Sequence, residues 1–286
     1  MKNAIEINNL VKKYDKGFTL GEINLKIPSG CVIGLIGENG AGKTTLLKSI
    51  LNIIKYDNGS IKIFDKDNKV DESVIKEEIG VVLDDTFFPE LLMVKDINSI
   101  MKDVYKNWSS NLFEEYLNKF KIEKNKIIKN LSKGMRKKLE IATALSHKPK
   151  LLILDEPTSG LDPIVRNDVL DIFLDFIKDE EHTILLSTHI TSDLEHIADK
   201  IVFINEGKVV LNENRDELID SYGVLKCDID KFDTISKDDI IKYKKNRYNY
   251  DILIKDREKI SKKYNDYIID KASLEDIMLI MIKGDK

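Results

Sequence analysis

The sequence predicts an α/β protein built around a buried parallel sheet, with a helical insertion and a small C-terminal α+β appendage. Residues 32–36, 151–154 and 183–187 form short, continuously apolar runs, which are typical of strands covered on both faces. Between residues 94 and 145 the apolar residues recur at helical spacing and glycine is nearly absent. This stretch is therefore expected to be mostly helical.

The remaining elements follow from the same periodicities and from turn sequences. Pro28-Ser29-Gly30 and Asp57-Asn58-Gly59 are turn signals, and Glu206-Gly207 separates two short apolar stretches as in a hairpin. Ser132 is a good N-cap for a following helix. In chain order we expect strands at 4–11, 18–27, 60–64 and 79–83, helices at 133–145 and 163–178, and a hairpin of 201–205 with 208–211.

The length of 286 residues allows one large domain and something smaller. After about residue 218 the amino-acid composition changes. Tyr, Lys, Asn and Asp dominate there, and no phosphate or carboxylate motif appears. We expect a nucleotide-binding domain at 1–218, with its helical subdomain at about 86–145, and a small accessory domain at 219–286.

Composition limits the classes of protein to which this chain can belong. Apolar residues make up 42% and charged residues 34% of the chain, as in soluble globular proteins. The net charge of −4 gives no global electrostatic reason to expect nucleic acid. No apolar run approaches the length of a membrane span, the N-terminus lacks the apolar stretch of a signal peptide, and two cysteines are too few for a disulfide framework. We expect a cytosolic protein.

Residues 37–45 match the phosphate-binding pattern G-x-x-x-x-G-K-[ST] between a predicted strand and a predicted helix. Glycines let such a loop turn its N–H groups inward, and the helix dipole points at the same spot. Lys43 can reach the β- and γ-phosphates, and the Thr44 hydroxyl is placed for Mg²⁺. The alternative is a glycine-rich turn that binds nothing. The predicted nucleotide contacts are Gly37, Asn39, Gly40, Ala41, Gly42, Lys43, Thr44 and Thr45.

The apolar run 151–154 ends in two acids, Asp155 and Glu156. Ligands of α/β sheets bind at the carboxyl ends of strands, where these carboxylates would lie. Asp155 is predicted to hold the Mg²⁺ shell, and Glu156 to act as the base for an attacking water. The alternative is a strand followed by an acidic turn.

Residues 131–135 (Leu-Ser-Lys-Gly-Met) precede the helix at 133–145. A helix start of this kind offers a hydroxyl, backbone N–H groups and a dipole to an anion. Taken alone, the segment is better interpreted as an ordinary capped helix.

Together these segments resemble the ATPase subunit of ABC transporters, over roughly residues 5–211 and in the family's order. Residues 131–135 resemble the family's signature sequence, and 159–162 its D-loop. His189 at the end of a strand resembles the switch histidine, and Tyr14 lies where the family places an aromatic ring that stacks on adenine.

The resemblance implies a P-loop NTPase (RecA-like) core with an antiparallel β subdomain and an inserted helical subdomain. It also implies ATP and Mg²⁺ as cofactors and a head-to-tail dimer, homomeric or heteromeric. Each ATP would lie between the phosphate loop of one subunit and Ser132 and Gly134 of the other. Glu156 would activate water, His189 would contact the γ-phosphate, and Asp162 would link the two sites.

Two positions depart from the family pattern. Asp84 stands where the family usually has Gln, and Lys133 replaces a Gly in the signature. A carboxylate at position 84 can bind Mg²⁺ directly, but it also adds negative charge beside a triphosphate. Asp84 is therefore a candidate metal ligand together with Thr44 and Asp155.

The resemblance favours the ATPase subunit of an exporter of drug, peptide or bacteriocin type, held at the inner face of the membrane by a separate membrane-spanning permease, with no nucleic-acid partner. The alternative is a non-transport ABC ATPase that acts on nucleic acid or the ribosome. About ninety residues separate Lys43 from Ser132, too few for the long coiled coils of chromosome-acting members. Ribosome-acting members carry two cassettes, and this chain has one.

Several other residues are expected to play no catalytic part. His147, His182 and His196 lack metal-ligand spacing and are predicted to be surface or helix residues. The basic run 136–138 is expected to be a solvated helix face. In the family, the region corresponding to 87–96 meets the coupling helices of the permease.

Overall fold

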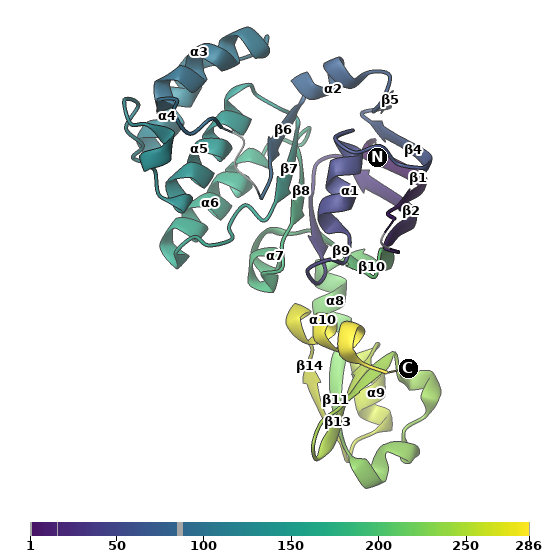
Figure 1. Ribbon diagram of the computed structural model, residues 1–286. Coiled ribbons are helices and arrows are strands. Elements are labelled where there is room, and N and C mark those ends of the chain that lie inside the picture. Colours follow the sequence, from purple (N-terminus) through teal and green to yellow (C-terminus); the bar gives the residue numbers. More distant parts are fainter. Residues whose placement is uncertain (1, 16, 85–87, 286) are drawn as a thin grey trace.

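The computed structural model describes residues 2–15, 17–84 and 88–285, and a six-stranded sheet lies at its centre (Figure 1). The strand order is β10-β9-β3-β8-β7-β6, and every neighbouring pair is parallel except the β9–β10 hairpin. The predicted parallel sheet and hairpin are therefore confirmed. The strands are β3 (Val32–Ile36), β6 (Ile79–Val82), β7 (Leu151–Asp155), β8 (Thr183–Ser187), β9 (Lys200–Asn205) and β10 (Lys208–Asn214).

The register of three central strands aligns their carboxyl ends. Ser187 of β8 pairs with Leu35 of β3 on one side and with Asp155 of β7 on the other. Parallel strands that end in one row send their following loops out from the same edge of the sheet. The segments after β3, β7 and β8 consequently start side by side.

Alternate residues of the central strands face two different cores. Ile33, Leu35 and Ile153 pack toward α1 (Lys43–Ile50) and a second, antiparallel sheet of order β2-β1-β4-β5. Burial of both faces explains why these strands are continuously apolar in sequence. The antiparallel sheet consists of β1 (Asn3–Lys13), β2 (Thr19–Pro28), β4 (Asn58–Ile63) and β5 (Lys66–Asp67), and α2 (Glu72–Glu77) precedes β6.

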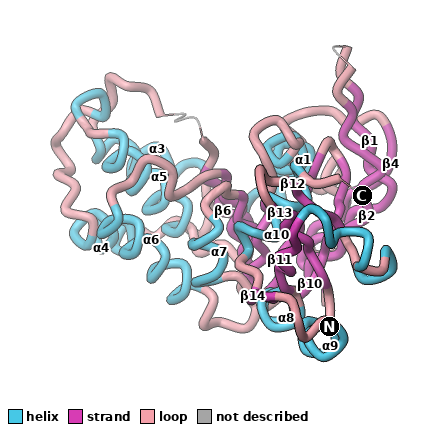
Figure 2. The backbone as a smooth tube through the Cα atoms, turned by 90° about the horizontal axis from the view of Figure 1, so that it is seen from below, coloured by secondary structure: helices cyan, strands magenta, loops and turns pink. Residues whose placement is uncertain are grey.

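The other face of the central sheet is covered by helices. Val32, Ile36 and Leu154 belong to the same apolar cluster as Phe113 of α4 and Phe173 of α6. Figure 2 shows α3, α4, α5 and α6 grouped on the side of the molecule away from the antiparallel sheet. These helices are α3 (Val94–Val104), α4 (Ser110–Lys119), α5 (Lys133–Ser146) and α6 (Pro163–Phe176), with η1 (Ile128–Asn130) before α5 and α7 (Thr191–Ile197) after β8.

The C-terminal part forms a third sheet, of order β12-β13-β11-β14, in a lobe beyond α8 and α10 (Figure 1). It has an apolar cluster of its own around Leu225, Ile252 and Ile260. In contrast, Ile277 and Ile280 of α10 join the main cluster of the helical side, so the lobe is packed onto the rest of the chain. Its elements are α8 (Arg215–Ser221), β11 (Gly223–Asp228), η2 (Ile229–Thr234), η3 (Lys237–Asp239), β12 (Lys242–Lys245), β13 (Asn249–Ile254), α9 (Arg257–Lys263), β14 (Ile268–Lys271) and α10 (Leu274–Lys283).

Lys137, which was expected to lie on a solvated helix face, is buried, and so is His147, which was expected to be a surface or helix residue. Lys137 lies inside the run 136–138, yet its ammonium forms an ion pair with Glu140 at 2.9 Å and donates to the backbone oxygen of Leu83 at 2.7 Å. His147 ends α5 beneath the ring of Tyr105, with ring centroids 4.0 Å apart. Sequence periodicity did not reveal this, because the hydrogen bonds from Lys137 to Leu83 and from His147 to Ile79 join residues that are distant in the chain.

No helix in the described ranges is both long enough and apolar enough to span a bilayer.

Replacing His147 is expected to change how stability depends on pH. Burial lowers the pKa of the His147 ring, whose Nε2–H donates to the Ile79 oxygen at 3.0 Å. The unfolded chain therefore binds this proton more readily than the folded one, so stability falls as the pH drops below the unfolded pKa of about 6.5. Between pH 6.5 and 5.5 this group should therefore remove unfolding free energy, by at most about 1 kcal/mol.

The variant His147→Gln keeps a donor for the Ile79 oxygen but does not titrate. Urea unfolding at the two pH values should show a smaller loss of unfolding free energy in this variant than in the wild type. An equal loss in both proteins would contradict the assignment.

Candidate nucleotide-binding site

The loop between β3 and α1 forms a cup with a buried cation at its base. The Lys43 ammonium donates to the backbone oxygens of Gly37 at 2.7 Å and Glu38 at 3.2 Å. The loop is closed by a backbone hydrogen bond from Ala41 to Glu38 and is tied to the β9–β10 turn by one from Gly207 to Ala41. Burial lowers the pKa of Lys43, and the carboxylates of Glu156 and Asp155 partly oppose this effect. A cation in such a cup suits the charge of a polyphosphate.

A pocket of about 630 Å³ opens above this loop. The aromatic rings of Tyr14 and Phe18 form one part of its wall, with ring centroids 6.2 Å apart, and Glu156 and Asp84 form another. Its volume and its combination of aromatic, cationic and acidic groups suit a nucleotide. The lining residues are Tyr14, Asp15, Phe18, Glu38, Asn39, Gly40, Gly42, Lys43, Thr44, Thr45, Asp84 and Glu156.

Three of these lining residues were not predicted. Asp15 and Phe18 lie beside Tyr14 in the β1–β2 connection, and Glu38 occupies a variable position of the loop pattern. The nearness of Phe18 to Tyr14 in sequence was a usable signal. Gly37 and Ala41 are absent from the lining, and their backbone groups shape the loop instead.

The Thr44 hydroxyl donates to Asp155 Oδ2 at 2.7 Å. Asp155 is buried, and its Oδ1 has no hydrogen-bond partner among the residues that the structure describes. Mg²⁺ takes oxygen ligands and usually keeps several waters, so a hydroxyl beside a buried carboxylate with a free oxygen fits this ion. In the described ranges no three His, Cys, Asp or Glu side chains cluster as metal ligands.

Glu156 and His189 meet at the edge of the same pocket. His189 Nδ1 lies 2.7 Å from Glu156 Oε2, and the ring nitrogen must donate because a carboxylate only accepts. The backbone of Glu156 has a positive φ of 51° and is held by a hydrogen bond from its N–H to the Ser187 oxygen at 2.8 Å. A carboxylate fixed at the mouth of a phosphate pocket can accept a proton from water.

Ser132, Gly134 and Asp162 do not line this pocket. Ser132 caps α5 by accepting from the Met135 N–H at 3.2 Å, and Asp162 caps α6 by accepting from the Val165 N–H at 3.1 Å. The two segments adjoin each other, because a Cβ on Gly134 would lie 3.3 Å from Leu161. Within one chain, the predicted site residues thus form two groups.

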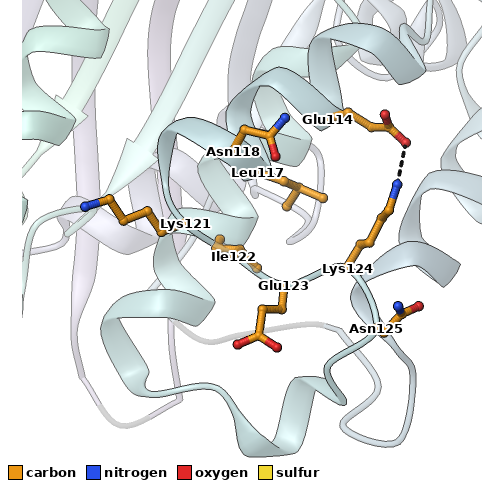
Figure 3. A pocket seen from close by; sticks show the side chains of 8 residues that line it. All are labelled: Glu114, Leu117, Asn118, Lys121, Ile122, Glu123, Lys124 and Asn125. Carbon is orange, nitrogen blue, oxygen red and sulfur yellow. Dashed lines mark hydrogen bonds and ion pairs between the residues drawn. The ribbon is translucent and has the colours of Figure 1, made fainter.

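A second hollow, of about 510 Å³, lies between α4 and the segment that follows it (Figure 3). Glu114 and Lys124 form an ion pair of 3.4 Å at its rim, and Leu117 and Ile122 contribute its apolar part. It contains none of the predicted site residues, and it lacks a glycine loop or a buried cation.

Comparison with known sequences identifies a family and named relatives of this chain. The family model described as ABC transporter matches residues 20–159. The lantibiotic transport ATP-binding protein SrtF of Streptococcus pyogenes is 39% identical over 215 residues, which cover 74% of this chain and 91% of that protein. The bacitracin transport ATP-binding protein BcrA of Enterococcus faecalis is 34% identical over 220 residues, covering 76% and 71%.

Comparison with solved structures supports the same fold. A structure described as an ATP-binding subunit of an ABC transporter superposes with a TM-score of 0.69 and 26% identity, covering 75% of this chain and 91% of that one. The expected P-loop NTPase fold is thereby confirmed.

A methyl group at Gly42 is expected to disrupt the phosphate loop. Gly42 has a φ of +111°, and a Cβ there would lie 3.0 Å from Leu20 and 3.1 Å from Phe18. Backbone strain and the clash together should cost Gly42→Ala about 2 kcal/mol of unfolding free energy. Chemical denaturation without nucleotide measures this loss.

Gly40→Ala is the matched control. Gly40 also has a positive φ, of +84°, but a Cβ there would meet nothing within 4 Å. This variant should show the backbone strain alone and therefore a smaller loss. Equal losses in the two variants would mean that the contacts with Leu20 and Phe18 are unimportant.

Proposed function

The chain belongs to the ABC transporter family of ATP-binding proteins, and from this premise we propose that it is the ATP-hydrolysing subunit of an exporter whose permease is a separate membrane-spanning polypeptide. The names of its relatives include lantibiotic and bacitracin transport proteins, so the proposed cargo is an antimicrobial peptide or drug. The chain would work at the cytoplasmic face of the membrane. The observation that supports the ATPase role is that Lys43, Thr44 and Glu156 line one pocket. Asp155 is hydrogen-bonded to Thr44, and His189 to Glu156.

ATP hydrolysis depends mainly on positioning and on charge stabilisation. Lys43 and the loop N–H groups would hold the β- and γ-phosphates, and Tyr14 would stack on adenine. Thr44 and Asp155 would hold Mg²⁺, which when bound neutralises charge on the phosphates. Glu156 would accept the proton of the attacking water, and His189, already hydrogen-bonded to it, would face the γ-phosphate. Asp84 lines the same pocket and is a further candidate for the metal shell.

A head-to-tail dimer would complete the site. Ser132 and Gly134 lie outside the pocket of their own chain, where they are available to the nucleotide of a second subunit. We divide the chain into a nucleotide-binding domain at 1–218, with a helical subdomain at about 86–145, and an accessory domain at 219–286. The separate sheet β12-β13-β11-β14 supports this division.

The proposed permease would dock on an apolar groove of about 440 Å³ between α1, α2, β6 and the end of α3. Ile53 and Val81 are exposed within it, and Leu83 continues it toward Asp84. A groove beside the segment that lines the nucleotide pocket would let a helix of the permease respond to ATP. The start of the 87–96 region, Phe87, lies outside the described residues.

Glu156→Gln should bind ATP but hydrolyse it at least about 100-fold more slowly, because the amide cannot accept the proton. A slowed site should also accumulate an ATP-dependent dimer. Steady-state phosphate release and light scattering with and without ATP measure the two effects. Hydrolysis near the wild-type rate would rule out Glu156 as the base.

Adding Ser132→Arg to Glu156→Gln tests whether the second group of residues acts in trans. The double variant should bind ATP as a monomer and fail to dimerise, since a bulky cation would replace the helix cap that meets the other subunit's nucleotide. Loss of ATP binding by the monomer would contradict the trans role.

Ile53→Glu should weaken docking to the permease by about tenfold while leaving ATP binding unchanged, because it puts a charge into an apolar groove. The measurement is the fraction of tagged chain that remains with cell membranes after a mild salt wash. Val70→Glu is the control, since Val70 is exposed but does not line the groove. Equal retention of both variants would place the docking surface elsewhere.

A further inference from the structure

Asp193, in the first turn of α7, is a fully buried carboxylate that the hydrolysis scheme leaves without a role. Its Oδ2 accepts from the Thr158 hydroxyl at 2.6 Å, and its Oδ1 accepts from Nε of Arg166. Arg166 also donates to the Ser192 hydroxyl at 2.6 Å. A buried charge persists only where such partners are in place, so these residues form one cooperative unit.

The partners of Asp193 flank two predicted site residues. Thr158 follows Glu156 by two positions, and the intervening turn is closed by a backbone hydrogen bond from Ser159 to Glu156. Arg166 lies one helical turn after Asp162, and its N–H donates to the Asp162 oxygen at 2.9 Å. Through them Asp193 is attached to both ends of the segment 156–162.

The backbone of Asp193 is also hydrogen-bonded to the turn that carries His189. The Asp193 N–H donates to the Ile190 oxygen at 3.1 Å, and the Ile190 N–H donates to the Thr188 hydroxyl at 3.1 Å. The His189 side chain is 51% exposed, whereas that of Glu156 is 13% exposed. Packing therefore restrains the His189 ring weakly, and its distance from Glu156 depends on the backbone that Asp193 anchors.

We propose that Asp193 is a positioning residue that joins the His189 turn to the segment 156–162, so that His189, Glu156 and Asp162 move as one unit. This inference rests on the proposed ATPase function and adds a residue to it. Asp193 touches no nucleotide; it acts through His189. A contact of His189 with the γ-phosphate would then be transmitted to Asp162, which the proposed dimer places at the second site.

A double-mutant cycle in the full chain tests the proposal. Asp193→Asn keeps the size of the side chain but removes its charge, and it should lower kcat about tenfold with the ATP dissociation constant changed less than about threefold. In a His189→Ala background the same substitution should lower kcat by less than about twofold, because the group through which it acts is already gone. A loss of the same size in both backgrounds overturns the proposal, since it would show a general structural effect.

Thr158 supplies a conservative test if Asp193→Asn folds poorly. Thr158→Ser keeps the hydroxyl and should retain nearly wild-type kcat, whereas Thr158→Val keeps the volume and should lose about threefold. Equal losses would attribute the effect to packing and overturn the proposal.

Glu195→Ala is the matched control on the same helix. Glu195 accepts from the Leu274 N–H at 3.1 Å and ties α7 to α10, away from the segment 156–162. Its kcat should stay within about twofold of wild type. A loss of kcat as large as that of Asp193→Asn, with the same dependence on His189, would show that any contact that holds α7 in place positions His189. This result would overturn the assignment to Asp193.

Two single variants, Glu156→Gln and His189→Ala, test the proposed function separately from the role of Asp193. If Glu156→Gln retains wild-type hydrolysis, the assignment of the base fails whatever Asp193 does. If His189→Ala alone leaves kcat unchanged, the role of His189 fails, and with it the proposal for Asp193, while the ATPase activity itself stands.

Discussion

The parallel register of β3, β8 and β7 is the constraint on which the rest of the molecule depends. Leu35, Ser187 and Asp155 lie in one row, so the phosphate loop, the His189 turn and the segment after Asp155 leave the sheet as neighbours. A slip of one residue in this ladder would turn every apolar side chain of the strand to the opposite core. The two separate cores, one under α1 and the other under the helices, therefore fix the register, and the register assembles the pocket.

Several charged side chains in and near the site are buried. Lys43, Asp155 and Asp193 are all buried, and each forms at least one side-chain hydrogen bond. Such partners are needed because an unpaired buried charge is costly. His189 differs from this group, since its side chain is half exposed and its contact with Glu156 depends on how the surrounding turns are anchored. The site thus combines a rigid phosphate cup with a more exposed catalytic pair.

The predicted site residues lie in two separate groups, as a site shared between two subunits would require. Tyr14, the phosphate loop and Glu156 surround one pocket, while Ser132 and Asp162 cap helices outside it. Both groups belong to one chain, and α7 lies between the catalytic pair and the C-terminal lobe. This short helix therefore contacts both the segment 156–162 and the C-terminal lobe.

The sequence by itself determined the parallel strands, the phosphate loop and the acids that follow β7, because continuous apolar runs and a loop pattern are local properties of the chain. It also located Tyr14 and His189 through the resemblance to a family. Only the tertiary structure decided that Lys137 and His147 are buried and that Asp193 links two segments. The physical reason is that these depend on contacts between residues far apart in the chain, and no local periodicity records which distant partner satisfies a buried polar atom.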